Sequence, residues 1–130
     1  MKNAPQVLFE WLTTAGTSLY TLVGDRVWPD QIRKGYTNTA AALVMSTDEI
    51  PNSRGDQVRV RATFRCYGGG ASDAAARAVY AALNDRLHNA SGATTSGGII
   101  SAFQETGGGR LDDPDEGWPM RVAVYDVVAR

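Results

Sequence analysis

The strongest constraint on the fold is an alternating stretch, QVRVRATFRC, at residues 57–66. Apolar side chains occupy every second position from Val58 to Cys66, and arginine or threonine occupies each position between them. Because successive side chains of a strand point to opposite faces of its sheet, this period of two predicts a strand with one buried and one polar face. We therefore expect a sheet whose arginine-bearing face meets water or another subunit.

The segments around this strand predict its neighbours. The apolar run AAALVMST at 40–47 predicts a preceding strand, and the turn-rich residues 48–57 predict a hairpin between the two. Further strands are expected at 99–105 and 120–128, with a polar loop at 91–97 and an exposed loop at 107–119. Residues 24–38 lose all periodicity, although Trp28 must be extended because it precedes a proline.

Three segments show helical spacing of apolar residues. They predict a first helix over 4–15, one or two further turns over 18–23, and an alanine-rich helix over 72–89 that Ser72 caps. The fold class expected is α+β, with a small antiparallel sheet of about four strands and two main helices packed on one face. The order is helix-strand-strand-helix-strand-strand, within a single domain of residues 1–130.

Charge and composition exclude several classes of protein. Fourteen acidic and thirteen basic residues give a net charge of −1, which argues against binding to nucleic acid or membrane surfaces through net positive charge. No stretch approaches the roughly 20 apolar residues that a membrane span needs. Cys66 is the single cysteine, so an internal disulfide and a cysteine-rich zinc site are excluded. We expect a soluble protein made in a reducing cytoplasm.

The sequence offers no set of residues that resembles an active site. His88 is the lone histidine and ends the predicted third helix, where a cation is favoured, and Cys66 continues the apolar face of a strand. The triple glycines at 68–70 and 107–109 fit no nucleotide-binding motif and are interpreted as turns. The tripeptide Arg54-Gly55-Asp56 is interpreted as a hairpin connection, although it also spells a cell-adhesion motif. We expect neither enzymatic activity nor a cofactor.

A cluster of acids near the C-terminus, Asp112, Asp113, Asp115 and Glu116, could supply oxygen ligands to a hard cation. Its spacing does not reproduce a calcium loop and Pro114 stiffens it, so no metal site is expected. The cluster is either a solvated loop tip or a charged docking loop.

Opposite charges gather in two parts of the chain. Arg54, Arg59, Arg61 and Arg65 lie on the predicted 40–66 hairpin, whereas residues 105–117 hold five acids against Arg110. A chain with one basic and one acidic element can meet a copy of itself head to tail, and such contacts close into rings. We therefore expect a subunit interface that involves Arg59, Arg61, Arg65, Asp112 and Asp113; two separately solvated faces are the alternative.

The order of elements and several short sequence segments resemble those of the tail-completion, or tail-terminator, proteins of long-tailed bacteriophages. The most distinctive match is Gly24-Asp25-Arg26-Val27-Trp28-Pro29. The end of the arginine strand at 64–67, the helix SDAAARAVYAALNDRLHN and the final RVAVYDVVAR follow in the family's order. The chain departs from the family's commoner pattern at Thr39 to Ala42, where a proline often leads into the first strand.

This resemblance implies a non-enzymatic virion protein without a cofactor. Members of the family form a ring, usually hexameric, on the head-proximal end of the tail tube, where the ring stops tube growth and joins the tail to the head connector. The implied partners are further copies of the chain, the tail tube protein and a connector or stopper protein. Double-stranded DNA passes through the channel transiently, and no membrane is involved.

Capping a tube requires two dissimilar axial surfaces. We expect the hairpin tip at 48–57 and the acidic loop at 107–118 to contact the axial neighbours. The residues assigned to these docking loops are Asp48, Arg54, Asp56, Arg110, Asp115, Glu116 and Trp118. The alternatives are another connector ring of the neck, a small enzyme or ligand-binding domain, and a host-cell toxin or regulator.

Overall fold

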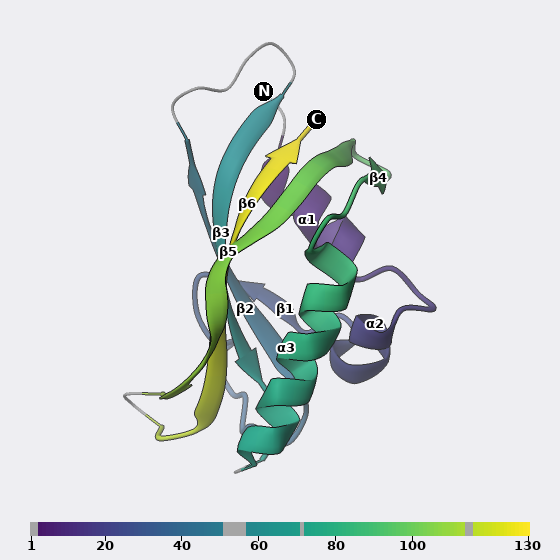
Figure 1. Cartoon of the computed structure of the whole chain (residues 1–130). Coiled ribbons are helices and arrows are strands. Elements are labelled where there is room, and N and C mark those ends of the chain that lie inside the picture. The colour runs from purple at the N-terminus through teal and green to yellow at the C-terminus, as the bar shows by residue number, and fades with distance from the viewer. Residues whose placement is uncertain (1–2, 51–56, 71, 114–115) are drawn as a thin grey trace.

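The computed structural model describes residues 3–50, 57–70, 72–113 and 116–130. The described residues form three helices and six strands, which follow one another along the chain (Figure 1). Their bounds are α1 Ala4–Leu12, α2 Ser18–Val23, β1 Val27–Pro29, β2 Ala42–Glu49, β3 Val58–Tyr67, α3 Asp73–Leu87, β4 Gly92–Ala93, β5 Gly98–Asp112 and β6 Pro119–Ala129.

The strands form one curled sheet in the order β1-β2-β3-β6-β5-β4. The predicted α+β class and the pairing of the 40–66 hairpin are confirmed: β2 and β3 are antiparallel, and β3 and β5 both pair antiparallel with β6. The expected number of about four strands is too small. The two additional strands, β1 and β4, are three and two residues long, and neither length is enough to show a period of two.

Strand β5 is much longer than the predicted 99–105 strand, because residues 107–112 continue to pair with β6 instead of forming an exposed loop. The pairing register shifts at three places, one of them between Gly107 and Gly109. Gly107 has φ 151°, and a Cβ added there would lie 2.6 Å from Ala123 Cα. The second triple glycine is therefore a bulged piece of strand rather than a turn.

The alternation at 57–66 is confirmed. All five apolar positions of β3 are buried, and they join inward residues of β6 such as Tyr125 and Val127 in a core under the helices. Phe64 and Tyr125 pack edge to face with ring centroids 5.8 Å apart. All three helices contribute to this core, so they cover one face of the sheet, which we call the helix side (Figure 1).

The helix limits follow local capping chemistry. Ser72 accepts a hydrogen bond from Ala75 N, as predicted, and α3 ends one residue before His88. The first helix ends at Leu12 rather than near residue 15, because the Thr13 hydroxyl bonds to the Phe9 carbonyl and α2 starts soon afterwards. Among the residues described, no helix is long and apolar enough to cross a membrane.

A second, smaller core lies on the opposite side of the sheet, which we call the open face. Val44, Tyr67 and Met120 are buried there beneath four partly buried side chains, Trp28, Ile32, Trp118 and Val122. This aromatic cluster covers one end of the open face and leaves the other end without a helix or loop from the described residues.

Candidate assembly interface

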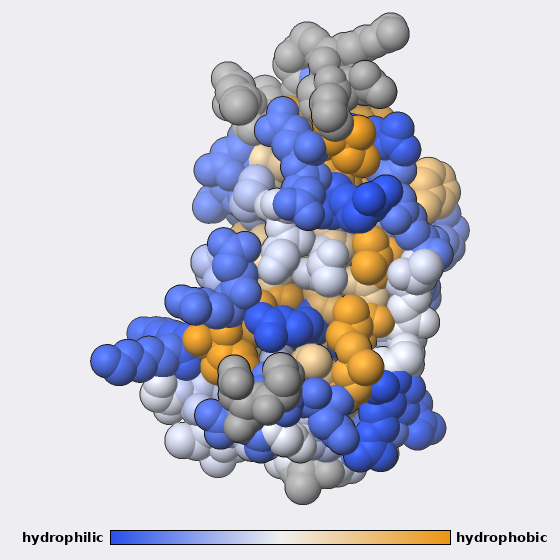
Figure 2. All heavy atoms as spheres, turned by 90° about the vertical axis from the view of Figure 1, so that its left-hand side faces the viewer, coloured by the Kyte–Doolittle hydropathy of each residue, from blue (hydrophilic) through white to orange (hydrophobic). Residues whose placement is uncertain are grey.

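The uncovered part of the open face carries the arginine row that the sequence predicted. Arg59 and Arg61 lie on it and face away from the helices, whereas Arg65, on the same face of β3, pairs in register with Val44 and Val122 at the end that the aromatic cluster covers. Figure 2 shows this side of the molecule, with apolar patches interleaved among hydrophilic groups. Phe103 of β5 pairs in register with Asp126 of this face and is 53% exposed, which is unusual for a phenylalanine. A mixed surface of this kind suits a protein contact.

The acids nearest these arginines belong to the same chain. Arg59 Nε donates to Asp126 Oδ1 at 2.9 Å, and Arg61 Nε donates to Glu105 Oε2 at 3.1 Å. The hydrogen bonds from Arg59 hold the pKa of Asp126 below its usual value. Both arginines remain about half exposed, and pairs of this kind are weak in water, so they can be exchanged for a stronger partner. Contacts of Arg59 and Arg61 with a neighbouring subunit therefore stay a prediction.

The two adjacent acids assigned to the subunit interface lie in different environments. Asp112 is exposed and pairs with Arg110 at 3.5 Å. Asp113 is only 5% exposed: its carboxylate accepts a hydrogen bond from the Tyr67 hydroxyl at 2.9 Å and another from Glu116 N at 2.9 Å. Burial raises the pKa of Tyr67, and the bond to Asp113 adds to the effect. Within one chain Asp113 therefore holds the β5–β6 turn on the aromatic cluster and offers little surface to a neighbour.

The strands that lead out of the two predicted docking loops begin at opposite ends of the sheet. Val58 at the start of β3 pairs with Ala129 at the end of β6, and Tyr67 at the end of β3 pairs with Met120. The start of β3 and the start of β6 therefore lie at opposite ends of the sheet, as Figure 1 also shows. Contacts of the two loops with axial neighbours stay a prediction.

The docking residues are distributed over these two ends. Asp48 is exposed near the end of β2, and Arg110 and Glu116 are exposed on the β5–β6 hairpin. Trp118 is half-buried and packs edge-on against Tyr36 and Tyr67. Arg54, Asp56 and Asp115 lie outside the described residues.

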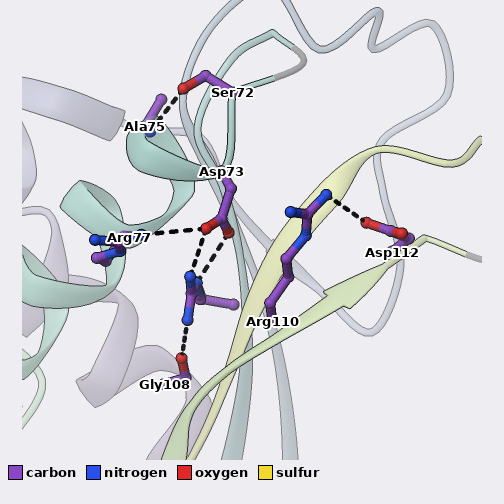
Figure 3. A network of polar contacts seen from close by, with 8 residues as sticks. Ser72, Asp73, Ala75, Arg77, Gly108, Arg110 and Asp112 are labelled. Atoms are coloured by element: carbon purple, nitrogen blue, oxygen red, sulfur yellow. Dashed lines mark hydrogen bonds and ion pairs between the residues drawn. The ribbon is translucent and has the colours of Figure 1, made fainter.

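Sequence reasoning missed the contact that holds the β5–β6 hairpin to the helix layer. Arg121 of β6 bonds to the carboxylate of Asp73 and to the Gly108 carbonyl, while Arg77 reaches the same carboxylate from the next turn of α3 (Figure 3). These hydrogen bonds, with that from Arg121 the largest cause, lower the pKa of Asp73. The place of Arg121 in the alternating pattern was the one available signal. Arg121 occupies a position of β6 that faces the helix side, and the next residues that face this side are apolar.

The two residues considered as catalytic candidates, His88 and Cys66, take part in contacts within the fold. His88 Nδ1 accepts a hydrogen bond from Gln104 N at the end of α3. Cys66 is fully buried, as predicted, and burial raises the pKa of its thiol. Within the described ranges, no group of three or more His, Cys, Asp or Glu side chains could hold a metal ion.

A pocket of about 330 Å³ opens between residues 31–36 and the β5–β6 turn. Its charged lining consists of Arg33, Lys34, Arg65, Asp113 and Glu116. Arg65 donates to the Asp30 carbonyl and Asp113 is held by Tyr67, so two of these side chains support the local structure.

Comparison with known proteins identifies a fold relative. No protein-family model and no curated protein matches the sequence. Among solved structures, a chain described as "Virion of native gene transfer agent (GTA) particle" shares the fold, with a TM-score of 0.68 at 18% sequence identity. The match covers 97% of this chain and 93% of that chain. The likeness therefore extends over the order of elements as a whole rather than one motif.

Proposed function

We propose that this chain is a non-enzymatic structural protein of a phage-like virion, and that it forms the tail-terminator ring. In this role a ring of copies, six in the usual arrangement, sits on the head-proximal end of the tail tube, stops its growth and joins it to the head connector. The observation that carries the proposal is the fold likeness to a chain of a gene transfer agent virion over nearly the whole length of both chains. The resemblance of the sequence to tail-completion proteins supports the finer assignment.

The arrangement of the hairpins suits such a role. A terminator must bind the tube with one end and present a different surface at the other, because identical ends would let addition continue. The end formed by β2 and β3 carries the exposed acidic residue Asp48, whereas the end formed by β5 and β6 carries Glu116 and Trp118. Two chemically different ends on one rigid sheet supply the asymmetry.

The near-neutral charge of the chain is compatible with passage of DNA through the ring. A net charge of −1 gives no strong electrostatic hold on phosphate groups, and a channel wall should not retain the genome that moves past it. On this proposal the protein is made in the host cytoplasm, as one domain of residues 1–130, and becomes part of the virion without contacting a membrane.

The decisive experiment is electron microscopy of particles made without this gene. We expect overlong tails and heads that lack tails, and complementation with the gene should restore joined particles of normal length. Joined particles with tails of normal length in its absence would contradict the proposal. A stopper ring of the neck is the second candidate; copurification with the connector instead of the tail tube subunit would favour it.

Docking through the β5–β6 end can be tested with a single charge. Glu116 is exposed and only its backbone N–H bonds to Asp113, so Glu116→Lys should leave the fold and the ring intact. We expect fewer joined particles when mutant tails are mixed with heads. Asp85→Lys, a reversal on an exposed position of α3, serves as the matched control. Equal joining efficiency for both variants would exclude Glu116 from the docking surface.

The arginine row can be tested by exchanging partners. Arg59→Asp combined with Asp126→Arg keeps an opposite pair within the chain but reverses the charges that a neighbour meets. If Arg59 binds an acid of the next subunit, the exchanged variant should fold normally and fail to form the ring. A normal ring would show that the pair acts within the chain alone.

A further inference from the structure

We infer that copies of this chain join edge to edge, with Arg110 and Asp112 on the outer edge of β5 pairing with Glu49 and Thr47 on the outer edge of β2 of the next copy. The inference rests on the proposed ring and names the strands that join its subunits. Arg110 and Glu49 form the ion pair that fixes the register of this contact.

The first observation is an open edge on β2. Leu43 N donates to the Arg26 carbonyl and the Met45 carbonyl accepts from Asp30 N, so the odd residues of β2 direct their backbone groups away from β3. Strand β1 ends at Pro29, opposite Met45. Beyond it, the outward backbone groups of Thr47 and Glu49 have no strand beside them among the described residues. Unpaired edges of this kind are templates for a strand from another chain.

The second observation is an open edge on β5, at the other side of the sheet. Near the middle of this edge, the end of α3 satisfies the outward groups: Asn89 N donates to the Ala102 carbonyl and Gln104 N donates to His88. Farther along, Asp113 N donates to Trp118, which directs the backbone of Arg110 and Asp112 away from β6. No described strand lies beside these two residues either.

The two edges match in direction and in face. Three antiparallel pairings separate β2 from β5, so β5 runs opposite to β2 within one chain. When two copies have the same orientation, β5 of one copy therefore lies antiparallel to β2 of the next. Arg110 pairs within the sheet with Arg121, and Glu49 pairs with Val60; both positions face the helix side. In an antiparallel pair, Arg110 opposite Glu49 places Asp112 opposite Thr47.

The chemistry beside the β2 edge suits an arginine. A groove of about 380 Å³ runs along this edge, and Pro5, Val58 and Val60 line it together with Thr47 and Glu49. The aliphatic part of Arg110 can lie on the apolar side chains while its guanidinium binds Glu49, which forms no ion pair with the described residues. In the single chain, Arg110 forms an exposed ion pair with Asp112, and breaking such a pair costs little free energy.

The offset between the two edges is compatible with a closed ring. Through the paired strands, Arg110 lies level with Leu43, which is six residues before Glu49 on β2. Aligning Arg110 with Glu49 of the next copy shifts that copy by about 20 Å along the strands, at ~3.3 Å per residue. The four central strands are about 19 Å wide at ~4.8 Å per strand. A shift equal to the width corresponds to strands tilted by about 45° from the ring axis, the upper end of the range in closed barrels.

Cross-linking tests the contact directly. In the double variant Glu49→Cys with Arg110→Cys, mild oxidation should give a ladder of disulfide-linked species up to the size of the ring on a non-reducing gel. Either single variant should stay monomeric on the gel, because a head-to-tail contact does not place a residue beside its own copy. Asp48→Cys with Arg110→Cys is the matched control, since Asp48 faces the open side and should not cross-link. The assay is run on the purified protein and on assembled particles.

Charge exchange provides the second test. Arg110→Glu and Glu49→Arg should each raise the concentration for half-assembly by about tenfold or more, and the combination should restore assembly. Equal cross-linking of the 48/110 and 49/110 pairs, or normal assembly of both single reversals, would overturn the inference. If tails are still capped normally in that case, the proposed function stands and only the contact is wrong. If loss of the gene leaves tails and heads normal, the function itself is wrong.

Discussion

Arg121 of β6 donates hydrogen bonds from Nε and Nη2 to the two carboxylate oxygens of Asp73, the first residue of α3. The same guanidinium donates from Nη1 to the carbonyl of Gly108 on β5 (Figure 3). One side chain thereby ties the start of a helix to two strands of the β5–β6 hairpin. This contact decides how firmly the hairpin is held against the rest of the fold.

Replacing this arginine should destabilise the protein more than replacing its exposed neighbour. In the Arg121–Asp73 pair the side chains are only 15% and 19% exposed, so Arg121→Gln leaves a poorly hydrated carboxylate. We expect Tm to fall by about 5 °C or more in thermal unfolding followed by circular dichroism. Arg77→Gln is the control, because Arg77 reaches the same carboxylate from water, and it should change Tm by less than about 2 °C. Equal losses for the two variants would contradict this account.

Stability should fall in acid, and Asp73 should contribute to that fall. Hydrogen bonds from Arg121 lower the pKa of Asp73, those from Arg59 lower the pKa of Asp126, and those from Ser96 lower the pKa of Glu10 to about 2. A carboxyl group whose pKa is lower in the folded state stabilises the fold above its unfolded pKa, and this stabilisation is lost as the pH falls through the folded value. We expect Tm to decrease progressively from about pH 5 towards pH 2.

The variant Asp73→Asn should show a smaller decrease of Tm over the same pH range, and a lower Tm at neutral pH. Asp85→Asn, on an exposed position of the same helix, should follow the wild type at every pH. An unchanged pH profile for Asp73→Asn would show that its pairing does not contribute.

Two glycines of one triplet should differ in how much the same substitution destabilises the protein. Gly107 has φ 151° and its added Cβ would meet backbone of Ala123, so Gly107→Ala should cost about 2 kcal/mol or more of unfolding free energy. Gly109 has open space around its Cβ position and no positive φ, so Gly109→Ala should stay within about 0.5 kcal/mol of the wild type. Urea denaturation measures both. If both variants are neutral, the bulge is not a required feature of β5.

The buried hydrogen bond between Tyr67 and Asp113 should be worth a measurable amount. Tyr67→Phe removes the hydroxyl from a carboxylate that is 5% exposed, and we expect a loss of about 1–3 kcal/mol in urea denaturation. Tyr20→Phe, at a half-buried tyrosine of α2, is the control and should be nearly neutral. A neutral Tyr67→Phe would mean that another group replaces the hydroxyl.

The local pattern of the sequence was enough to predict the central part of the fold. Alternation identified β3 with its buried face, and helical spacing with a serine cap identified α3, because each pattern is repeated several times within one element. Strands β1 and β4 could not be predicted in this way. Their conformation comes from pairing with a longer neighbour, and this pairing leaves no periodic trace in two or three residues.

Only the part of the candidate site that depends on local alternation could be predicted from the sequence. The arginine row of β3 follows from alternation, but Asp126 and Glu105, which pair with it, come from strands whose register a single sequence does not show. The buried state of Asp113 depends on Tyr67, 46 residues away along the chain. Among the described acids of the 112–116 cluster, the difference between exposed Asp112 and Glu116 and structural Asp113 therefore becomes visible only when the strands are paired.

The burial of Cys66 gives the chain a practical advantage for following assembly. Its thiol is fully buried, and burial raises its pKa, which keeps it protonated. Alkylating reagents should therefore not react with it in the native state. The unmodified protein is thus already a background-free host for a fluorophore or spin label on a newly introduced surface cysteine. Distances between labelled copies in solution could then be read without removing the natural residue.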